Sequence, residues 1–252
     1  MSIGIYIVAP PKDIDAGKIC SYHSGQIIGR CAIDIIEAIN SRYSVRAFKA
    51  DPVPKAVLEE LLTVSQRAPS WANTQTWEFA VAGGKVMQEL RETMAARAFA
   101  QDERGPDIPR PEWPSPYKER RRENGISLYK ALGIQKDDVE RQLKWFVDMY
   151  RFFDAPNSIF IYTERDLSAW AMMNVGLMAQ TISLAALHFG LGSIMLAAGA
   201  GYPDIVRRML TIPESKQLVI AIAIGYPDPG AAVNKFRTER APLSEVCTWH
   251  GF

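Results

Sequence analysis

A long apolar stretch, AWAMMNVGLMAQTISLAALHFGLG from Ala169 onward, constrains the fold of this chain more than any other feature of the sequence. Its length is sufficient for a membrane span, but a membrane helix accommodates polar side chains poorly. The stretch contains several of them, namely Asn174, Gln180, Thr181, Ser183 and His188. An apolar helix that does not cross a membrane is buried at the centre of a domain. The stretch therefore predicts a core helix that ends at Gly190.

Four shorter apolar segments predict the strands of a sheet. They are WEFAVAGG at 77–84, NSIFIYTE at 157–164, GSIMLAA at 192–198 and QLVIAIAIGYPD at 217–228. The last is apolar at nearly every position, which is typical of a strand covered on both faces. Helical spacing of apolar residues predicts the covering helices, near 32–40, within 51–70, and over 87–98, 117–134, 136–153 and 202–210. We therefore expect an α+β fold, with a central sheet of about four strands and helices on both faces.

The domain organisation follows from where these patterns begin and stop. Residues 1–32 show no clear period, so we expect an N-terminal extension, followed by a single domain over 33–252. Pro106, Pro116 and the prolines between them disfavour regular structure, which predicts that 102–150 is an excursion able to form a lid. The polar tail after residue 234 is expected to end in a short strand.

The charge balance and the cysteines narrow the class of ligand. The chain has 29 basic and 28 acidic residues, which argues against nucleic-acid or membrane-surface binding and favours a small molecule. Its three cysteines, Cys20, Cys31 and Cys247, have no metal-ligand spacing, and so sparse a set is typical of the reducing cytoplasm. In KERRRE at 118–123, glutamates flank the arginines, which favours a salt-bridged helix face over a nucleic-acid site.

The sequence names no catalytic side chain, because it carries no phosphate-binding glycine loop, no HExxH helix and no GxSxG elbow. Four clusters remain as candidates for ligand binding. In the first, SRYSVRAF, Arg42, Ser44 and Arg46 offer two guanidinium groups and a hydroxyl that can bind a phosphate. Taken alone, these residues favour an ordinary solvated turn over a phosphate site.

The other three clusters follow in chain order. APSWANTQTWEF at 68–79 offers amide side chains and tryptophans just before a predicted strand, where ligands often bind. The small residues of LAAGAG at 196–201 allow a flat ligand to lie close to the backbone. NKFRTER at 234–240 adds Lys235, Arg237 and Arg240, which are solvated charges unless the first cluster needs partners.

The order and spacing of these four motifs resemble the FMN-dependent nitroreductase family, over about residues 33–249. The segment RRRENGISLYKALGI at 120–134 is similar to the longer members that act on nitrobenzoates and other nitroaromatic compounds. The resemblance implies a mostly antiparallel sheet in a domain-swapped homodimer, with FMN at the subunit interface. It also implies a cytoplasmic NAD(P)H oxidoreductase that reduces nitroaromatic compounds by ping-pong hydride transfer through flavin N5, with no catalytic side chain and no metal.

The site residues that the resemblance implies fall into four groups. The FMN phosphate and ribityl chain are assigned to Arg42, Tyr43, Ser44, Arg46, Arg237 and Arg240. The partner subunit is expected to contribute Pro69, Ser70, Trp71, Asn73 and Gln75. The flavin ring is expected to lie against Leu196, Ala197, Ala198 and Gly199. Substrate contacts are assigned to Trp71, Trp113, Tyr117 and Tyr129.

Two positions depart from the family pattern, and three other functions stay open. Trp71 stands where many members have a small polar residue, and Thr76 where many have proline. The same scaffold could carry reductive dehalogenation, although SPYKER at 115–120 does not reproduce the Glu, Tyr and Lys set of the deiodinase branch. A flavin-binding store or sensor would bind FMN without turnover. A nucleic-acid binder would use Arg120, Arg121 and Arg122.

Overall fold

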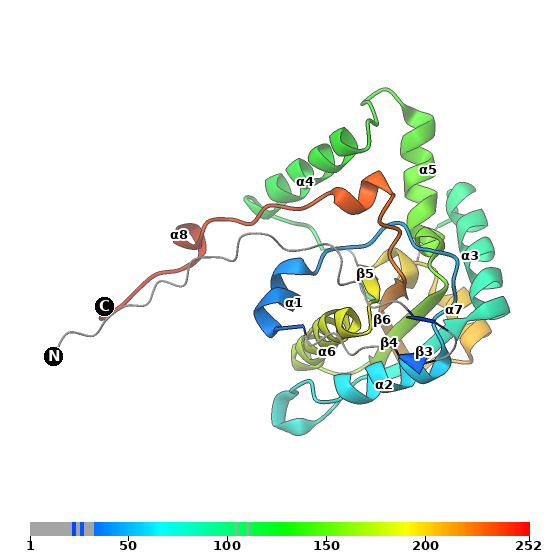
Figure 1. Ribbon diagram of the computed structural model, residues 1–252, viewed down its shortest axis with the longest axis horizontal. Coiled ribbons are helices and arrows are strands. Elements are labelled where there is room, and N and C mark those ends of the chain that lie inside the picture. Colours follow the sequence, from blue (N-terminus) through cyan, green and yellow to red (C-terminus); the bar gives the residue numbers. More distant parts are fainter. Residues whose placement is uncertain (1–21, 24–25, 28–32, 104, 110) are drawn as a thin grey trace.

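The computed structural model of the protein describes residues 22–23, 26–27, 33–103, 105–109 and 111–252. Most of the expected N-terminal extension, 1–32, therefore lies outside the described residues. Within it, only two short strands are described, β1 (Tyr22–His23) and β2 (Gln26–Ile27), which pair antiparallel. The described residues from 33 onward form one sheet with helices on both faces (Figure 1).

The main sheet has four strands in the order β3-β4-β6-β5. Each neighbouring pair is antiparallel, as the resemblance implied. The strands are β3 (Glu78–Gly83), β4 (Asn157–Glu164), β5 (Gly192–Leu196) and β6 (Lys216–Gly225). All four lie where the apolar segments predicted them. β5 ends at Leu196, and the alanines that follow it turn away from the sheet.

Alternating side chains of the two central strands explain why both faces of the sheet are covered. Phe160 of β4 lies opposite Ala221 of β6, and both point into one hydrophobic cluster. Their neighbours Ile159 and Ile222 also lie opposite each other and point into the second cluster, on the other face. Since successive side chains of a strand point to opposite faces, a strand that is apolar at every position needs helices on both sides.

Two layers of helices supply that cover (Figure 1). On one face lie α2 (Lys55–Ser65) and α6 (Ala169–His188). On the other lie α3 (Gly84–Phe99), α5 (Val139–Tyr150) and α7 (Pro203–Leu210). The predicted helices are therefore confirmed, with α5 shorter at both ends than its pattern.

The predicted core helix, α6, is buried along one side. Val175, Met178 and Ile182 pack into the cluster shared with α2, β4 and β6. Gly190, with φ 67°, ends the helix as predicted. The helix is long and apolar enough to cross a membrane, but 44% of its most apolar window is buried inside the protein. Its other side, including Trp170 and Met173, is exposed, so the expectation of burial all round does not hold within one chain.

The predicted excursion, 102–150, divides into two parts that behave differently. No helix or strand is assigned to the described residues between α3 and α4 (Tyr117–Ala131), as the prolines predicted. In α4 only Leu128 is buried, and the helix lies outside the two layers, beside the C-terminal segment (Figure 1). By contrast, α5 packs against α3, and its Tyr150 is fully buried.

The C-terminal tail extends away from the layered body and carries a short helix, α8 (Leu243–Val246). The expectation of a short strand at this end was wrong. Pro242 is the N-cap of this helix, and no strand partner lies beside this part of the tail among the described residues.

Candidate functional site

The segment 42–49 runs along the edge of the sheet at β5. Helix α1 (Ile35–Ser41) begins at Asp34, whose carboxylate accepts the Ile36 N–H at 2.8 Å. It ends at Arg42, where the backbone becomes extended, and the chain then lies beside β5. There Ser44 bridges Ser193 in a parallel sense, and the Val45 N–H donates to the Ser193 carbonyl at 3.1 Å.

A glycine of β5 allows this close approach. A Cβ on Gly192 would lie 2.5 Å from Cγ2 of Val45 and 2.7 Å from Cγ of Pro227, which is closer than side chains tolerate. Beyond Val45, the chain continues along the end of β6, where the Lys49 N–H donates to the Tyr226 carbonyl at 2.8 Å. The first predicted cluster is thus fixed at the sheet edge by backbone bonds on either side of Arg46.

Asn234 joins the fourth cluster to the first. This buried side chain accepts the Arg46 N–H at 2.9 Å and donates to the carbonyls of Ala47 and Asp228, each at 2.8 Å. The backbone carbonyl of Asn234 accepts a hydrogen bond from the Arg237 guanidinium at 2.7 Å. Segments 188 residues apart in sequence are therefore held together by one amide side chain.

Four arginines lie on the two segments that meet at this junction. Partial burial lowers the pKa of Arg42, and the nearby positive charge of Arg240 lowers it further. Burial lowers the pKa of Arg46. The Arg237 guanidinium lies 3.6 Å from the ring centroid of Tyr43, within range of a cation–π interaction. Among the described residues, none of the four arginines forms an ion pair with a carboxylate.

Arginines without carboxylate partners are chemically suited to binding an anion. Partly burying several cations without acidic partners raises the free energy of the protein, and a bound anion lowers it. Guanidinium groups bind phosphate oxygens through charge-assisted, often bidentate hydrogen bonds. The geometry thus favours the phosphate interpretation of Arg42, Ser44 and Arg46 over that of a solvated turn.

The third predicted cluster lies at the other end of β5. Ser193, next to the arginines, is four residues before Ala197, a separation of about 13 Å along an extended strand. Ala197 is exposed and Ala198 half-buried, so this turn offers small side chains at the surface. Leu196 and Gly199 are buried. A Cβ on Gly199 would lie 2.5 Å from Cβ of Ala221, so packing against β6 alone requires glycine there.

The second predicted cluster, the loop 69–75, lies away from the other three within one chain. It leads into β3, which is separated from β5 by the two central strands, or about 14 Å across three strand spacings. Asn174 of α6 anchors the loop: it accepts the Trp71 N–H at 2.9 Å and donates to the Thr74 and Thr76 hydroxyls at 3.3 and 3.2 Å. The Trp71 ring stacks at 6.4 Å on Trp170, and both rings are exposed.

The remaining loop residues form bonds within the turn. Ser70 Oγ accepts the Gln75 N–H at 3.0 Å, and the Gln75 side chain donates to the Asn73 carbonyl at 3.1 Å. Asn73 and Gln75 have positive φ values, 57° and 47°. Pro69 lies immediately before this turn. The predicted polar residues of the loop therefore shape a tight surface turn that one chain alone does not bring to the arginines.

Apart from Trp71 of the loop, the predicted substrate contacts lie near the start and the end of α4. Trp113 and Tyr117 form an edge-to-face pair at 6.2 Å, and both are exposed. Tyr129 is half-buried near the end of the helix. In the basic run between them, Arg120 pairs with Glu245 of the tail at 3.2 Å. A hydrogen bond from Ser115, and then the charges of Lys118 and Arg122, lower the pKa of Glu119.

Two functional residues were missed by sequence reasoning. Asn234 belongs to the quoted NKFRTER motif, but nothing local distinguishes it from a solvated amide. Asn174 was used only as an argument against a membrane span. Its signal was its isolation, since a polar side chain in an apolar helix is stable only with hydrogen-bond partners.

Comparison with known proteins places the chain among flavin-dependent enzymes. Residues 39–226 match the sequence model of the nitroreductase family. The chain is 33% identical over 220 residues to the nitroreductase NfnB of Mycolicibacterium smegmatis, covering 85% of this chain and 93% of that protein. It is 31% identical over 229 residues to a 4-nitrobenzoate reductase of a Nocardioides species, covering 86% and 91% of the two proteins.

The fold agrees with the same relatives. The crystal structure of the FMN-dependent nitroreductase NfnB from Mycobacterium smegmatis, in complex with NADPH, matches with a TM-score of 0.81 and 32% identity. The match covers 86% of this chain and 100% of that chain. An iodotyrosine deiodinase of Nematostella vectensis is more distant, at 23% identity over 222 residues.

Proposed function

Because the chain belongs to the nitroreductase family, we propose that it is an FMN-dependent oxidoreductase that uses NADPH to reduce nitroaromatic compounds. The observation that carries this proposal is the junction of Arg42, Arg46, Arg237 and Arg240, which lacks a carboxylate partner among the described residues. A phosphate-bearing cofactor supplies the missing negative charge.

The residues of this chain fit FMN at both of its ends. The four arginines and the Ser44 hydroxyl would hold the phosphate, and Tyr43 would remain beneath the Arg237 guanidinium. The turn at Ala197 and Ala198, at the far end of β5, would face the flavin ring with small side chains. When bound, FMN would supply the redox chemistry: it would take a hydride from NADPH and pass two electrons to the nitro group, which takes up two protons from the solvent and loses one oxygen as water.

The protein contributes binding and orientation and needs no acid, base or nucleophile. Arg42 and its neighbours neutralise the cofactor phosphate, which fixes one end of the flavin. The β5 strand sets the separation between this end and the Ala197 turn. Since the side chains at the turn are small, the acceptor and the nicotinamide can both approach the flavin face in alternation.

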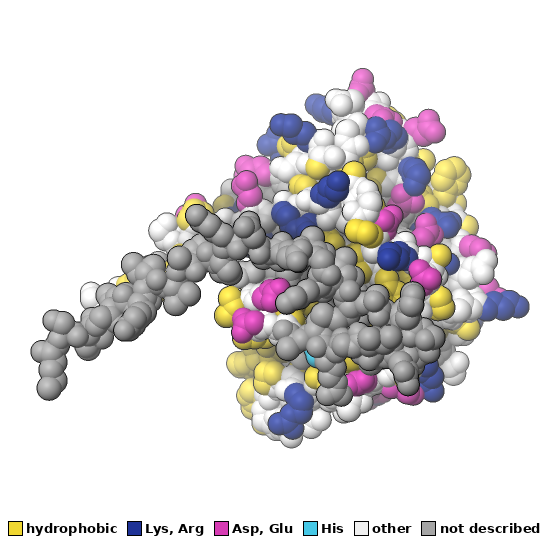
Figure 2. Space-filling view, in the orientation of Figure 1, with side chains coloured by type: hydrophobic (Ala, Val, Ile, Leu, Met, Phe, Trp, Pro, Cys, Tyr) yellow, Lys and Arg dark blue, Asp and Glu magenta, His cyan; other side chains and the backbone are white. Residues whose placement is uncertain are grey.

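We further propose that the protein acts as a homodimer, because one chain leaves the site incomplete. The loop 69–75 lies at the opposite sheet edge from the arginines, so its contribution requires a second copy. The outer side of α6, with Trp170, Met173 and Leu177, is exposed, as are Ile35, Ile36 and Ile39 of the neighbouring α1. Figure 2 shows hydrophobic side chains gathered on this side of the molecule, at the lower left of the view.

The tail supports an exchange of segments between the two copies. It leaves the body of the protein with α8 and exposes Leu243, Val246, Trp249 and Phe252 (Figure 1). A second copy would cover these apolar side chains, which gives the domain-swapped arrangement. For the acceptor, we propose contacts from Trp71 of the loop and from Trp113, Tyr117 and Tyr129 around α4. We place the enzyme in the cytoplasm, where NADPH is available.

Steady-state turnover with paired acceptors tests this function. The purified, FMN-loaded protein is assayed with NADPH and either a nitrobenzoate or a halophenol. We expect oxidation of NADPH coupled to loss of the nitro group, and little turnover of the halophenol. Faster release of halide than of reduced nitro product would favour a dehalogenase on the same scaffold. Tight FMN binding without NADPH oxidation would favour a store or sensor.

A further inference from the structure

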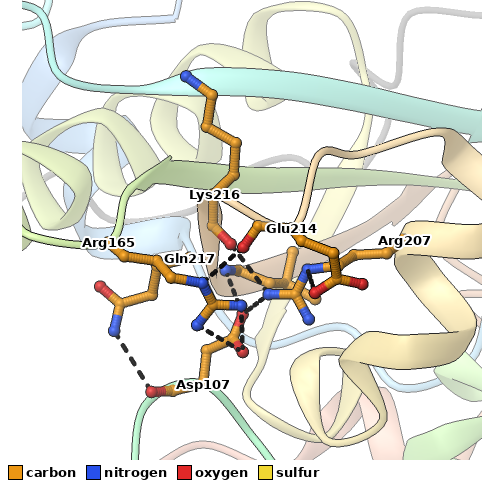
Figure 3. Close-up of polar contacts among 7 residues, drawn as sticks. Asp107, Arg165, Arg207, Glu214, Lys216 and Gln217 are labelled. Carbon is orange, nitrogen blue, oxygen red and sulfur yellow. Dashed lines mark hydrogen bonds and ion pairs between the residues drawn. The ribbon is translucent and has the colours of Figure 1, made fainter.

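Asp107 is the most completely bonded residue of the proline-rich segment between α3 and α4 (Figure 3). Its side chain is only 7% exposed. One carboxylate oxygen accepts the Leu218 N–H at 2.7 Å and pairs with the Arg207 guanidinium. The other accepts two N–H groups of Arg165, each at 3.3 Å. The Asp107 carbonyl accepts the Gln217 side-chain amide at 3.3 Å. The segment is therefore attached to the body of the protein at this residue.

The position of Leu218 explains why β6 needs a carboxylate. β5 pairs with β6 only as far as Leu196 opposite Ala221. From there to Lys216, the side of β6 that faces β5 has no strand beside it among the described strands. The Leu218 N–H points to that edge, and Asp107 satisfies it as a missing strand would. The proline-rich segment thus takes the place of β5 where β5 ends.

Arg207 gives the carboxylate a second role. This residue lies on α7, its side chain is 7% exposed, and it also donates to the Lys216 carbonyl at 2.9 Å. The Glu214 carboxylate lies 3.7 Å from Arg207 Nε but is 85% exposed, so Asp107 is the buried counter-charge. Removing one member of a buried ion pair leaves an uncompensated charge, which is far more costly than loss of an exposed pair.

The same segment is fixed beside the turn proposed to face the flavin. The Tyr202 hydroxyl, directly after that turn, donates to the Asp102 carbonyl at 3.3 Å. Gly199 of the turn packs against Ala221, at the point where β5 ends and the part of β6 held by Asp107 begins. Tyr117, a proposed substrate contact, opens α4 ten residues after Asp107. The start of the excursion and the turn proposed to face the flavin are therefore both attached to the same part of β6 and its flanking residues.

We propose that Asp107 is a positioning residue, which holds the root of the excursion on the β6 edge and so places α4 and its aromatic side chains relative to the nitroaromatic acceptor. The effect on acceptor binding rests on the proposed function. Asp107 does not touch the reacting atoms. Because Asp107 precedes Tyr117 by ten residues, we expect it to affect acceptor binding and not the proposed phosphate site, which is at the other end of β5.

The test compares Asp107→Asn with Glu112→Gln, an exposed acid of the same segment that loses the same charge. In Asp107→Asn we expect hydrogen exchange of the Leu218 amide to accelerate about tenfold, as when one charge-assisted bond is lost. We expect the acceptor KM to rise by a similar factor, while kcat and FMN affinity stay within about twofold. Glu112→Gln should match the wild type in all four measurements.

Other outcomes contradict the proposal. Unchanged exchange at Leu218 would show that Asp107 does not hold the segment. Faster exchange at Leu218 with an unchanged acceptor KM would contradict the role in substrate positioning. A lower kcat and a lower FMN affinity together with a higher KM would indicate that the whole fold is disturbed, which also contradicts a specific role of Asp107. If Asp107→Asn fails to fold, Arg165→Gln gives a milder test, because it removes only the half-exposed partner. If the wild-type protein does not reduce the nitro compound, both the proposed function and the role of Asp107 in acceptor binding are contradicted. Hydrogen exchange at Leu218 would still test whether Asp107 attaches the segment to β6.

Discussion

At the level of single residues, the proposed site relies on arginines that form no ion pair with a carboxylate in the part of the chain that the structure describes. Burial, and then the charge of Arg240, lower the pKa of Arg42, and burial lowers the pKa of Arg46. A cofactor phosphate would balance these positive charges and accept charge-assisted hydrogen bonds. These arginines therefore contribute more to binding than to the stability of the free chain.

Arg42→Ala and Arg237→Ala should each weaken FMN binding, because each removes charge-assisted bonds to the phosphate. Loss of such a bond costs about 1.5–3 kcal/mol. Titration of the cofactor-free protein with FMN, followed by flavin fluorescence, gives the dissociation constants. Arg208→Ala on the exposed side of α7 removes the same charge away from the junction and should leave affinity unchanged. Wild-type affinity in both site variants would mean that the phosphate lies elsewhere.

Asn234→Ala should reduce both stability and FMN affinity, because Asn234 satisfies buried backbone groups on both sides of the junction. Leaving such groups unpaired costs about 1–3 kcal/mol. Thermal unfolding and FMN titration measure the two effects. Asn124→Ala on exposed α4 is the control, and it should change neither quantity. A stable Asn234→Ala protein with normal FMN affinity would rule out this amide as the link between segments.

At the scale of elements, the strands and helices could be predicted because their signal is local. Each strand is a run of apolar residues, and β6 shows by itself that both faces of the sheet are covered. The junction of the site is different, since it joins Arg46 to Asn234 across 188 residues through a single side chain. No periodicity encodes that contact. Asp107 was hidden for the same reason, because its partners lie on α7, β6 and the end of β4.

The sequence alone suggested that Gly199 is small to let a ligand approach the backbone, but packing against Ala221 also requires glycine at this position. Gly199→Ala should destabilise the fold by about 1–3 kcal/mol, because its Cβ would overlap Ala221 and Phe152. Gly125→Ala in α4 meets no atom within 4 Å and should stabilise slightly, by roughly 0.5–1 kcal/mol. Urea unfolding of the two variants measures the difference. Equal stability would show that the turn can shift without cost.

At the scale of the whole molecule, the proposed dimer explains features that one chain leaves open. The loop at Trp71 and the arginines lie at opposite sheet edges, and the outer side of α6 is apolar yet exposed. Sequence reasoning took α6 for a helix buried all round because its composition has no polar face. The structure shows which side the chain itself covers, and the proposed second copy would cover the other side.

Met173→Lys should disrupt the dimer, because it places a charge in the proposed interface. Burying an unpaired charge costs several kcal/mol, and a cost of about 3 kcal/mol would raise the dimer dissociation constant roughly 150-fold. Sedimentation velocity measures the state of association, and FMN content is measured on the same samples. Val86→Lys on the exposed side of α3 is the matched control. A Met173→Lys protein that remains dimeric would place the interface elsewhere.

The central claim is that this chain is a reducible flavoprotein. The most direct measurement is the visible absorption spectrum of the purified protein, taken before and after NADPH is added without air, followed by a nitrobenzoate. We predict flavin bands that bleach with NADPH and return when the nitro compound is added. Bands that persist with both NADPH and NADH would contradict the proposed enzyme. Absence of flavin even after incubation with FMN would contradict the cofactor site itself.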